Sequence, residues 1–122
     1  MPAYDESNIF ARILRGEIPC KKVYEDQWAL AFHDINPLAP VHVLVIPKGP
    51  YVSFADFTAN ASPDAVAGFF KAVGKTAILL DLDEPGYRIL ANHGEHAHQE
   101  VPHFHVHVFG GAPLGMMLKK LA

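Results

Sequence analysis

The sequence predicts an α+β fold: a roughly five-stranded antiparallel sheet with one short and one long helix. Two observations predict it. Apolar residues between positions 62 and 81 recur at steps of three and four, the period of a helix with one buried face. Near the end of the chain, by contrast, histidine alternates three times with a bulky apolar residue, and period two is typical of a strand.

The first expected helix covers residues 9–15, with Asp5 or Ser7 as its N-cap and Gly16 directly after its end. Its apolar stripe consists of Ile9, Phe10, Ile13 and Leu14. We interpret Ile9, Phe10 and Ile13, together with Ile18 beyond the helix, first of all as ordinary core.

The long helix begins at Ser62-Pro63-Asp64, which combines a capping serine, a proline at the first helical position and an acid in the first turn. It is expected to run to about Asp81 and to cover one side of the sheet. Its apolar face consists of Val66, Phe69, Phe70, Val73, Ala77 and Leu80. No structure is assigned to residues 49–61.

The expected strands are residues 21–26 and 28–34, which form a hairpin, then 42–48, 87–92 and the histidine-rich strand. Residues 34–40 and 93–98 are loops by composition. In residues 42–48, His42, Leu44 and Ile46 alternate with Val43 and Val45. In the last strand His103, His105 and His107 share one face, while Phe104, Val106 and Val108 face a core.

Length and composition set outer bounds on function. The 122 residues fit one domain, 1–122, with half of them apolar and 19% charged. The net charge of −3 excludes the basic stripe of a nucleic-acid binder. Cys20 is the only cysteine, which excludes an intrachain disulfide and a cysteine-based zinc site. We see no signal peptide and no apolar run near the roughly 18 residues that span a bilayer, so a cytoplasmic protein without a membrane partner is expected.

Three imidazoles on one strand face are a poor choice for packing, because each ring has a donor and an acceptor to satisfy. One interpretation is a zinc site made by His-x-His and a third histidine. The other is a phosphate site in which a neutral imidazole is the nucleophile and its neighbours bind phosphate oxygens. The spacing by itself does not choose between them.

Further blocks along the chain point to a family. They are Ile9-Phe10-x-x-Ile13, Gly16-Glu17-Ile18-Pro19, Phe32-x-Asp34-Ile35-x-Pro37, Ala39-Pro40-x-His42, Val45-Ile46-Pro47-Lys48, Asn92, and Gln99-x-Val101-x-His103-Phe104-His105-Val106-His107-Val108-Phe109-Gly110-Gly111. In this order they resemble the histidine triad (HIT) family of nucleotide hydrolases and transferases, most closely its branch of histidine triad nucleotide-binding proteins.

The resemblance implies a role for each site residue. His105 is the catalytic nucleophile, His103 and His107 bind phosphate oxygens and orient it, and His42 supports them from the neighbouring strand. Asp34 accepts hydrogen bonds from the ribose hydroxyls, as suits an ionised carboxylate. The remaining nucleotide-binding residues are Ile9, Phe10, Ile18, Phe32 and Ile35 around the purine base, and Asn92, Gln99, Glu100 and Val101 near the phosphate or leaving group.

The resemblance further implies a HIT-like fold, a homodimer whose sheets join edge to edge, and a C-terminal segment near the partner's site. The family commonly has Gly at the position of His98, so the loop around His98 is expected to be reshaped. Several of its members carry a further His at the position of Pro50, so the role of that histidine is expected to be dispensable or lost here. His93, His96 and His98 match no family role and are interpreted as solvated.

The function so predicted is hydrolysis of purine nucleoside phosphoramidates at the α-phosphate, through a nucleotidyl-histidine intermediate, with no metal and no cofactor. One alternative is a dinucleoside polyphosphate hydrolase, although Gly110-Gly111 favours the phosphoramidate branch. Another is a nucleotide-binding adaptor with vestigial activity, which the complete triad disfavours. A zinc-binding protein is the weakest alternative.

Overall fold

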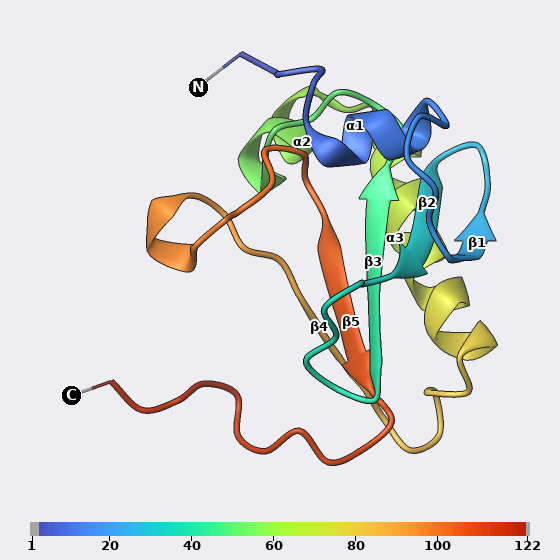
Figure 1. Ribbon diagram of the computed structural model, residues 1–122, viewed down its shortest axis with the longest axis vertical. Helices are drawn as coiled ribbons and strands as arrows, with labels where there is room; N and C mark the ends of the chain where they lie inside the picture. The colour runs from blue at the N-terminus through green and yellow to red at the C-terminus, as the bar shows by residue number, and fades with distance from the viewer. Residues whose placement is uncertain (1–2, 122) are drawn as a thin grey trace.

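The computed structural model describes residues 3–121, and its strands form one antiparallel sheet (Figure 1). The strands are β1 Lys22–Glu25, β2 Ala29–His33, β3 Val41–Pro47, β4 Arg88–Leu90 and β5 Val106–Gly110. Their order across the sheet is β1-β2-β3-β5-β4, and every neighbouring pair is antiparallel. The α+β class and the five strands are therefore confirmed, with β3 at the centre.

Each face of the sheet has its own apolar cluster, because alternate strand residues point to opposite sides. The long helix α3, Pro63–Leu79, lies behind the sheet in Figure 1 and packs Phe69, Ala72 and Val73 against one face. The short helix α1, Ile9–Leu14, covers the other face with Phe10. The strand residues that meet Phe10 are Leu30, Phe32, Leu44 and Ile46.

Both predicted helices are present, with small differences at their ends. Ser62 caps α3 as expected, and its side-chain oxygen accepts from the Ala65 N–H at 3.1 Å. The N-cap of α1 is Asn8, not Asp5 or Ser7, which instead close a turn upstream of it. Gly16 follows the helix with φ +78°, a conformation that glycine adopts without strain.

A second short helix, α2 Phe54–Asn60, corrects the prediction of a single short helix. Ser53 accepts from the Asp56 N–H at 3.2 Å, while the Asp56 carboxylate accepts from the Val52 N–H at 2.8 Å. A serine followed three residues later by an acid is a helix-start signal, so the sequence did contain evidence for α2. A single 3-10 turn, η1 Glu95–Ala97, lies in the loop before the triad.

The histidine-rich segment is only partly a strand. Its ladder pairing begins at Val106, so His103 and His105 precede β5 instead of lying within it. The predicted alternation nevertheless holds, because Phe104, Val106 and Val108 join the α3-side cluster. The histidine rings point to the opposite face, where Phe10 lies edge-on to His103 and His105.

The glycine pair after the triad is required by close packing. A Cβ on Gly110 would lie 2.6 Å from Leu82 Cδ2, which is too close for any side chain. Gly111 has φ +87° and passes beside Pro40 and Val41. Within residues 3–121, no helix combines the length and apolarity needed to cross a membrane.

Candidate active site

The α1 face of the sheet brings four histidines together where β3 and β5 lie side by side. His42 comes from β3 and His107 from β5, while His103 and His105 come from the extended segment before β5. The rings of His105 and His107 are 5.1 Å apart, and Phe10 of α1 lies 5.0 Å from the His105 ring. The four predicted catalytic residues therefore form one cluster.

His103 is the fully buried member of the cluster, with 0% of its surface exposed. Its Nε2 lies 2.9 Å from the Pro47 carbonyl oxygen, which can only accept, so Nε2 carries the proton. Burial holds the pKa of His103 down at about 4, so the ring is neutral near pH 7 and Nδ1 is an acceptor. That acceptor receives the Tyr4 hydroxyl at 2.6 Å.

Both ring nitrogens of His103 are thus occupied inside the protein. This geometry is inconsistent with the expected hydrogen bond from His103 to a phosphate oxygen. What His103 does offer the site is its backbone carbonyl oxygen, which lies 2.7 Å from His105 Nδ1. The physical reason is its position upstream of β5, where the ring turns into the core beneath α1.

The contact with the His103 carbonyl decides which ring nitrogen of His105 carries the proton. A carbonyl oxygen accepts, so His105 Nδ1 carries the proton and Nε2 keeps its lone pair. Burial lowers the pKa of His105, which favours the neutral ring. No buried side-chain nitrogen or oxygen in the described part of the chain lacks a partner, so the unpaired Nε2 reaches solvent. His105 therefore presents an unprotonated ring nitrogen at the surface of the cluster.

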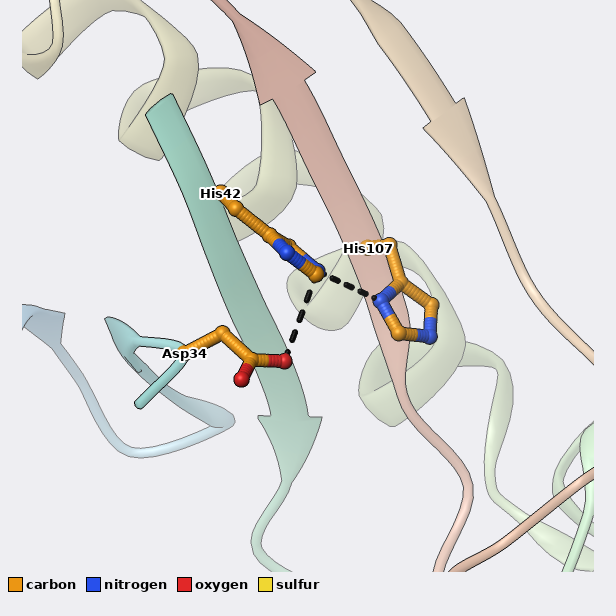
Figure 2. Close-up of side chains that lie close together, drawn as sticks. All are labelled: Asp34, His42 and His107. Carbon is orange, nitrogen blue, oxygen red and sulfur yellow. Dashed lines mark hydrogen bonds and ion pairs between the residues drawn. The ribbon is translucent and has the colours of Figure 1, made fainter. Parts of the chain in front are cut away.

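Two hydrogen bonds in series decide the protonation state of His107, and Figure 2 shows the second of them, between His42 and His107. The Leu38 N–H donates to His42 Nδ1 at 3.1 Å, so the proton of neutral His42 is on Nε2. That Nε2–H points at His107 Nδ1, 2.9 Å away, which leaves the His107 proton on its own Nε2. Burial lowers the pKa of His42, and burial together with His105 and His42 lowers that of His107 to about 4. His107 is thus a hydrogen-bond donor beside the lone pair of His105.

Phe109 packs against the hydrogen-bonded pair of His42 and His107. Its ring stacks on His107 at 5.5 Å between centroids, and it lies 4.2 Å from the His42 ring. An aromatic ring on both imidazoles keeps water from the hydrogen bond between them, which strengthens that bond.

Asp34 lies beside His42 at the start of the loop after β2. Its Oδ2 is 3.4 Å from His42 Nε2, and its Oδ1 accepts from the Asn36 N–H at 2.8 Å. The second contact is the local turn that an Asx residue often forms. One oxygen is thus engaged by the loop, and Figure 2 shows the carboxylate directed toward the two histidines.

Asp34, His42 and His107 are also the residues whose spacing suits a metal ion, since one ligand atom from each lies within 4.8 Å of the others. The surrounding hydrogen bonds do not fit a metal. A metal on His42 Nε2 would move the ring proton to Nδ1, where it would face the Leu38 N–H, a second donor. Metal-binding histidines instead direct their other N–H at an acceptor. A site from all three triad residues fails as well, because both His103 nitrogens are occupied.

The predicted base-pocket residues differ in exposure. Phe10 and Phe32 are buried edge to face, 5.7 Å apart, below the histidines. Ile18 is half-buried, whereas Ile9 is 43% exposed and Ile35 is 87% exposed. The interpretation of Ile9 as ordinary core is therefore wrong. The exposed isoleucines offer apolar surface that a flat apolar ligand could cover.

The residues before the triad border a hollow of about 510 Å³, lined by Val52, Gly94, Glu95, His98, Gln99, Glu100 and Pro102. The Gln99 side chain holds the loop before the triad in place. Its amide nitrogen donates to the Val52 and Val101 carbonyls, and its oxygen accepts from the Gly94 N–H. Glu100 is exposed and pairs with His98 at 3.1 Å. His98 has φ +56°, the left-handed conformation that glycine adopts most readily.

Asn92 and Val101 are half-buried at the two ends of the same loop. Val101 packs against the α1-side cluster. Of the outlying histidines, His93 accepts weakly from the Ala55 N–H at 3.4 Å, and all three are exposed. A smaller cavity of about 180 Å³, beside Trp28 and Tyr51, includes none of the histidines.

Comparison with known proteins agrees with this geometry. The HIT domain family model matches residues 15–114. The chain belongs to the HIT domain family. It is 63% identical over 117 residues to a HIT-like protein of Azospirillum brasilense, covering 96% of each chain. It is 41% identical over 113 residues to the purine nucleoside phosphoramidase of Escherichia coli strain K12, covering 93% of this chain and 94% of the other.

Solved structures give the same result. The HIT family hydrolase from Clostridium thermocellum superimposes with a TM-score of 0.85 at 39% identity, covering 93% of this chain and 99% of the other. The HIT-like fold is thereby confirmed, and this HIT family member is hydrolase-like.

Sequence reasoning missed three residues that contact the histidine cluster, namely Tyr4, Pro47 and Leu38. Tyr4 is 99 positions from His103, and Pro47 is 56 positions away. No sequence spacing signals a pairing over such distances.

Proposed function

We propose that this HIT family protein hydrolyses purine nucleoside phosphoramidates through a nucleotidyl intermediate on His105. The observation that carries the proposal is the hydrogen bond from His105 Nδ1 to the His103 carbonyl oxygen. It fixes the tautomer in which the solvent-facing Nε2 is unprotonated, and a neutral imidazole nitrogen is a good nucleophile.

In the first step His105 Nε2 attacks the α-phosphorus, and a bond from nitrogen to phosphorus forms as the bond from phosphorus to the leaving amine breaks. The amine departs with a proton from solvent. The nucleotidylated ring carries a positive charge, which its Nδ1–H shares with the His103 carbonyl. The His107 Nε2–H donates to a phosphate oxygen and stabilises the charge that develops there.

In the second step a hydroxyl from water replaces His105 on phosphorus, and the nucleoside monophosphate leaves. The two steps together add one water molecule across the phosphorus–nitrogen bond. His42 keeps His107 in the donating tautomer throughout, because its own Nδ1 accepts from Leu38.

Recognition of the nucleoside is assigned to the residues around this centre. Phe10 and Phe32, with Ile9, Ile18 and Ile35 at the rim, offer an apolar slot to a purine base. Asp34 offers acceptor oxygens to the ribose hydroxyls. The E. coli relative named purine nucleoside phosphoramidase, 41% identical, supports this choice of substrate.

The decisive experiment compares wild type with His105→Asn. The variant is expected to bind purine nucleotide but to lose turnover by orders of magnitude, because the group that forms the covalent bond is gone. Acid-quenched wild type should carry the nucleotidyl mass on the peptide that contains His105. His96→Asn, at an exposed loop histidine, is the matched control and should retain full activity. Near-normal rates in His105→Asn would end the proposal.

The same purified protein distinguishes the two hydrolase classes. A panel of nucleoside phosphoramidates and dinucleoside polyphosphates should show the higher kcat/KM for the phosphoramidates. The reverse order would assign the protein to dinucleotide hydrolysis. Binding without turnover of either class would favour an adaptor.

We also propose that the protein acts as a homodimer. Strand β4 is an edge of the sheet, and Ile89 on it is 49% exposed. Ile78 and Leu79 at the end of α3 are 60% and 57% exposed. Edge strands with apolar side chains invite pairing, which a two-fold dimer would close. Light scattering should give twice the chain mass of 13.4 kDa, and Ile89→Lys should shift it toward the monomer.

A further inference from the structure

Tyr4 reaches the buried end of the histidine cluster from the opposite end of the chain. Its hydroxyl lies 2.6 Å from His103 Nδ1, and the two rings meet edge to face at 5.6 Å. Because His103 Nε2–H is donated to Pro47, the Tyr4 hydroxyl is the donor in this contact. The two edges of the His103 ring are therefore held by two separate segments.

The segment that carries Tyr4 is itself anchored. The Asp5 carboxylate accepts from the Ser7 N–H at 2.9 Å, and the Asp5 carbonyl accepts from the Asn8 side chain at 2.7 Å. Asn8 in turn caps α1 through the Ala11 N–H. Farther along, the Arg15 guanidinium donates to the Glu6 carbonyl at 2.8 Å. Tyr4 is thus placed by a turn fixed to α1, the helix that covers the site.

We propose that Tyr4 is a positioning residue for the nucleophile, acting through His103. Tyr4 and Pro47 clamp the His103 ring, and the clamped residue presents the backbone carbonyl that holds the proton of His105 Nδ1. The inference rests on the proposed function for its effect on turnover, but the clamp itself is measurable without substrate.

The physical argument turns on the burial of His103, which has 0% of its surface exposed. Without the Tyr4 hydroxyl, Nδ1 is a buried acceptor with no donor, an arrangement that folded proteins avoid. The unpaired Nδ1 is satisfied again if the ring turns or if water enters beside it. Either change displaces the carbonyl to which His105 is hydrogen-bonded. A small displacement of a reacting group lowers the rate of the chemical step and leaves ground-state binding intact.

The test uses Tyr4→Phe, which removes only the hydroxyl. We expect kcat to fall about tenfold while KM for a nucleoside phosphoramidate stays within about twofold. The matched control is Tyr24→Phe, which removes a tyrosine hydroxyl bonded to Asp26 at 2.8 Å on β1, away from the histidines. The control should keep the kcat of wild type. An unchanged kcat in Tyr4→Phe, or a rise in KM alone, would overturn the proposal.

The second arm is nitrogen-15 NMR of the histidine rings, which needs no turnover and whose wild-type measurement needs no variant. In wild type, His103 should show a protonated Nε2 and an Nδ1 signal shifted by a hydrogen bond. In Tyr4→Phe the Nδ1 signal should move toward that of a free ring nitrogen, and in Tyr24→Phe it should not. A free Nδ1 in wild type would refute the clamp. If wild type cleaved no phosphoramidate, the proposed function would fail. The NMR measurement would still show whether Tyr4 is hydrogen-bonded to His103.

Discussion

Stability should fall in mild acid because of the buried His103. Burial holds the pKa of this ring at about 4 in the folded protein, compared with an ordinary value of 6.5. Between these two pH values the unfolded chain takes up a proton and the folded protein does not. The unfolded state therefore gains stability as the pH falls. The contribution of neutral His103 to the free energy of unfolding is complete above about pH 6.5 and is lost toward pH 4.

The size of the effect follows from the same two values. The interval from 6.5 to about 4, at about 1.4 kcal/mol for each pH unit, amounts to about 3–4 kcal/mol. A domain of this size has a total free energy of unfolding of about 5–15 kcal/mol, so one residue accounts for a substantial part. Half-buried His107, with a pKa also lowered to about 4, contributes in the same direction.

Urea unfolding followed by circular dichroism at several pH values in this interval provides the assay. His103→Gln keeps a donor for the Pro47 carbonyl but cannot titrate. The free energy of unfolding of the variant should be lower than that of wild type at pH 7. As the pH falls, it should decrease less steeply than in wild type, and the two slopes should differ by about 1.4 kcal/mol per pH unit. His96→Gln, at an exposed position, should keep the wild-type slope. Equal slopes in wild type and His103→Gln would refute the argument.

Three further predictions concern the site and its support. Glu100→Gln should lower kcat/KM for a lysyl phosphoramidate about two- to fivefold more than for a propyl one, because an exposed carboxylate attracts a cationic leaving group only weakly; an unchanged ratio would make Glu100 an ordinary surface residue. Exhaustive chelation should leave activity within about twofold, because no proposed step needs a Lewis acid; activity lost with zinc and restored by it would contradict this. Gly110→Ala should lower the free energy of unfolding by about 1–3 kcal/mol in a urea titration, since its Cβ would lie 2.6 Å from Leu82; a neutral result would show that Leu82 gives way.

The sequence by itself determined the antiparallel sheet, the helices α1 and α3, and the family of the chain. Period two gave the faces correctly in the two strands to which it was applied, with Leu44 and Ile46 on the α1 side and Val43, Val45, Val106 and Val108 on the α3 side. Capping residues located α3, and the order of the blocks identified the HIT family. These features are local, because burial on a sheet or helix repeats with the geometry of the element.

Only the tertiary structure decided which nitrogen of each histidine carries the proton. For His103 the partners that set this are Tyr4 and Pro47, and neither is signalled by a spacing or a period. A ring nitrogen responds to the one atom within about 3 Å of it. For His103 the fold brings that atom from a distant segment, since Tyr4 lies 99 positions away, whereas the atoms that face Nδ1 of His105 and of His42 belong to residues two and four positions away. These contacts occupy both ring nitrogens of His103, which was expected to bind a phosphate oxygen, while its backbone carbonyl faces His105 Nδ1.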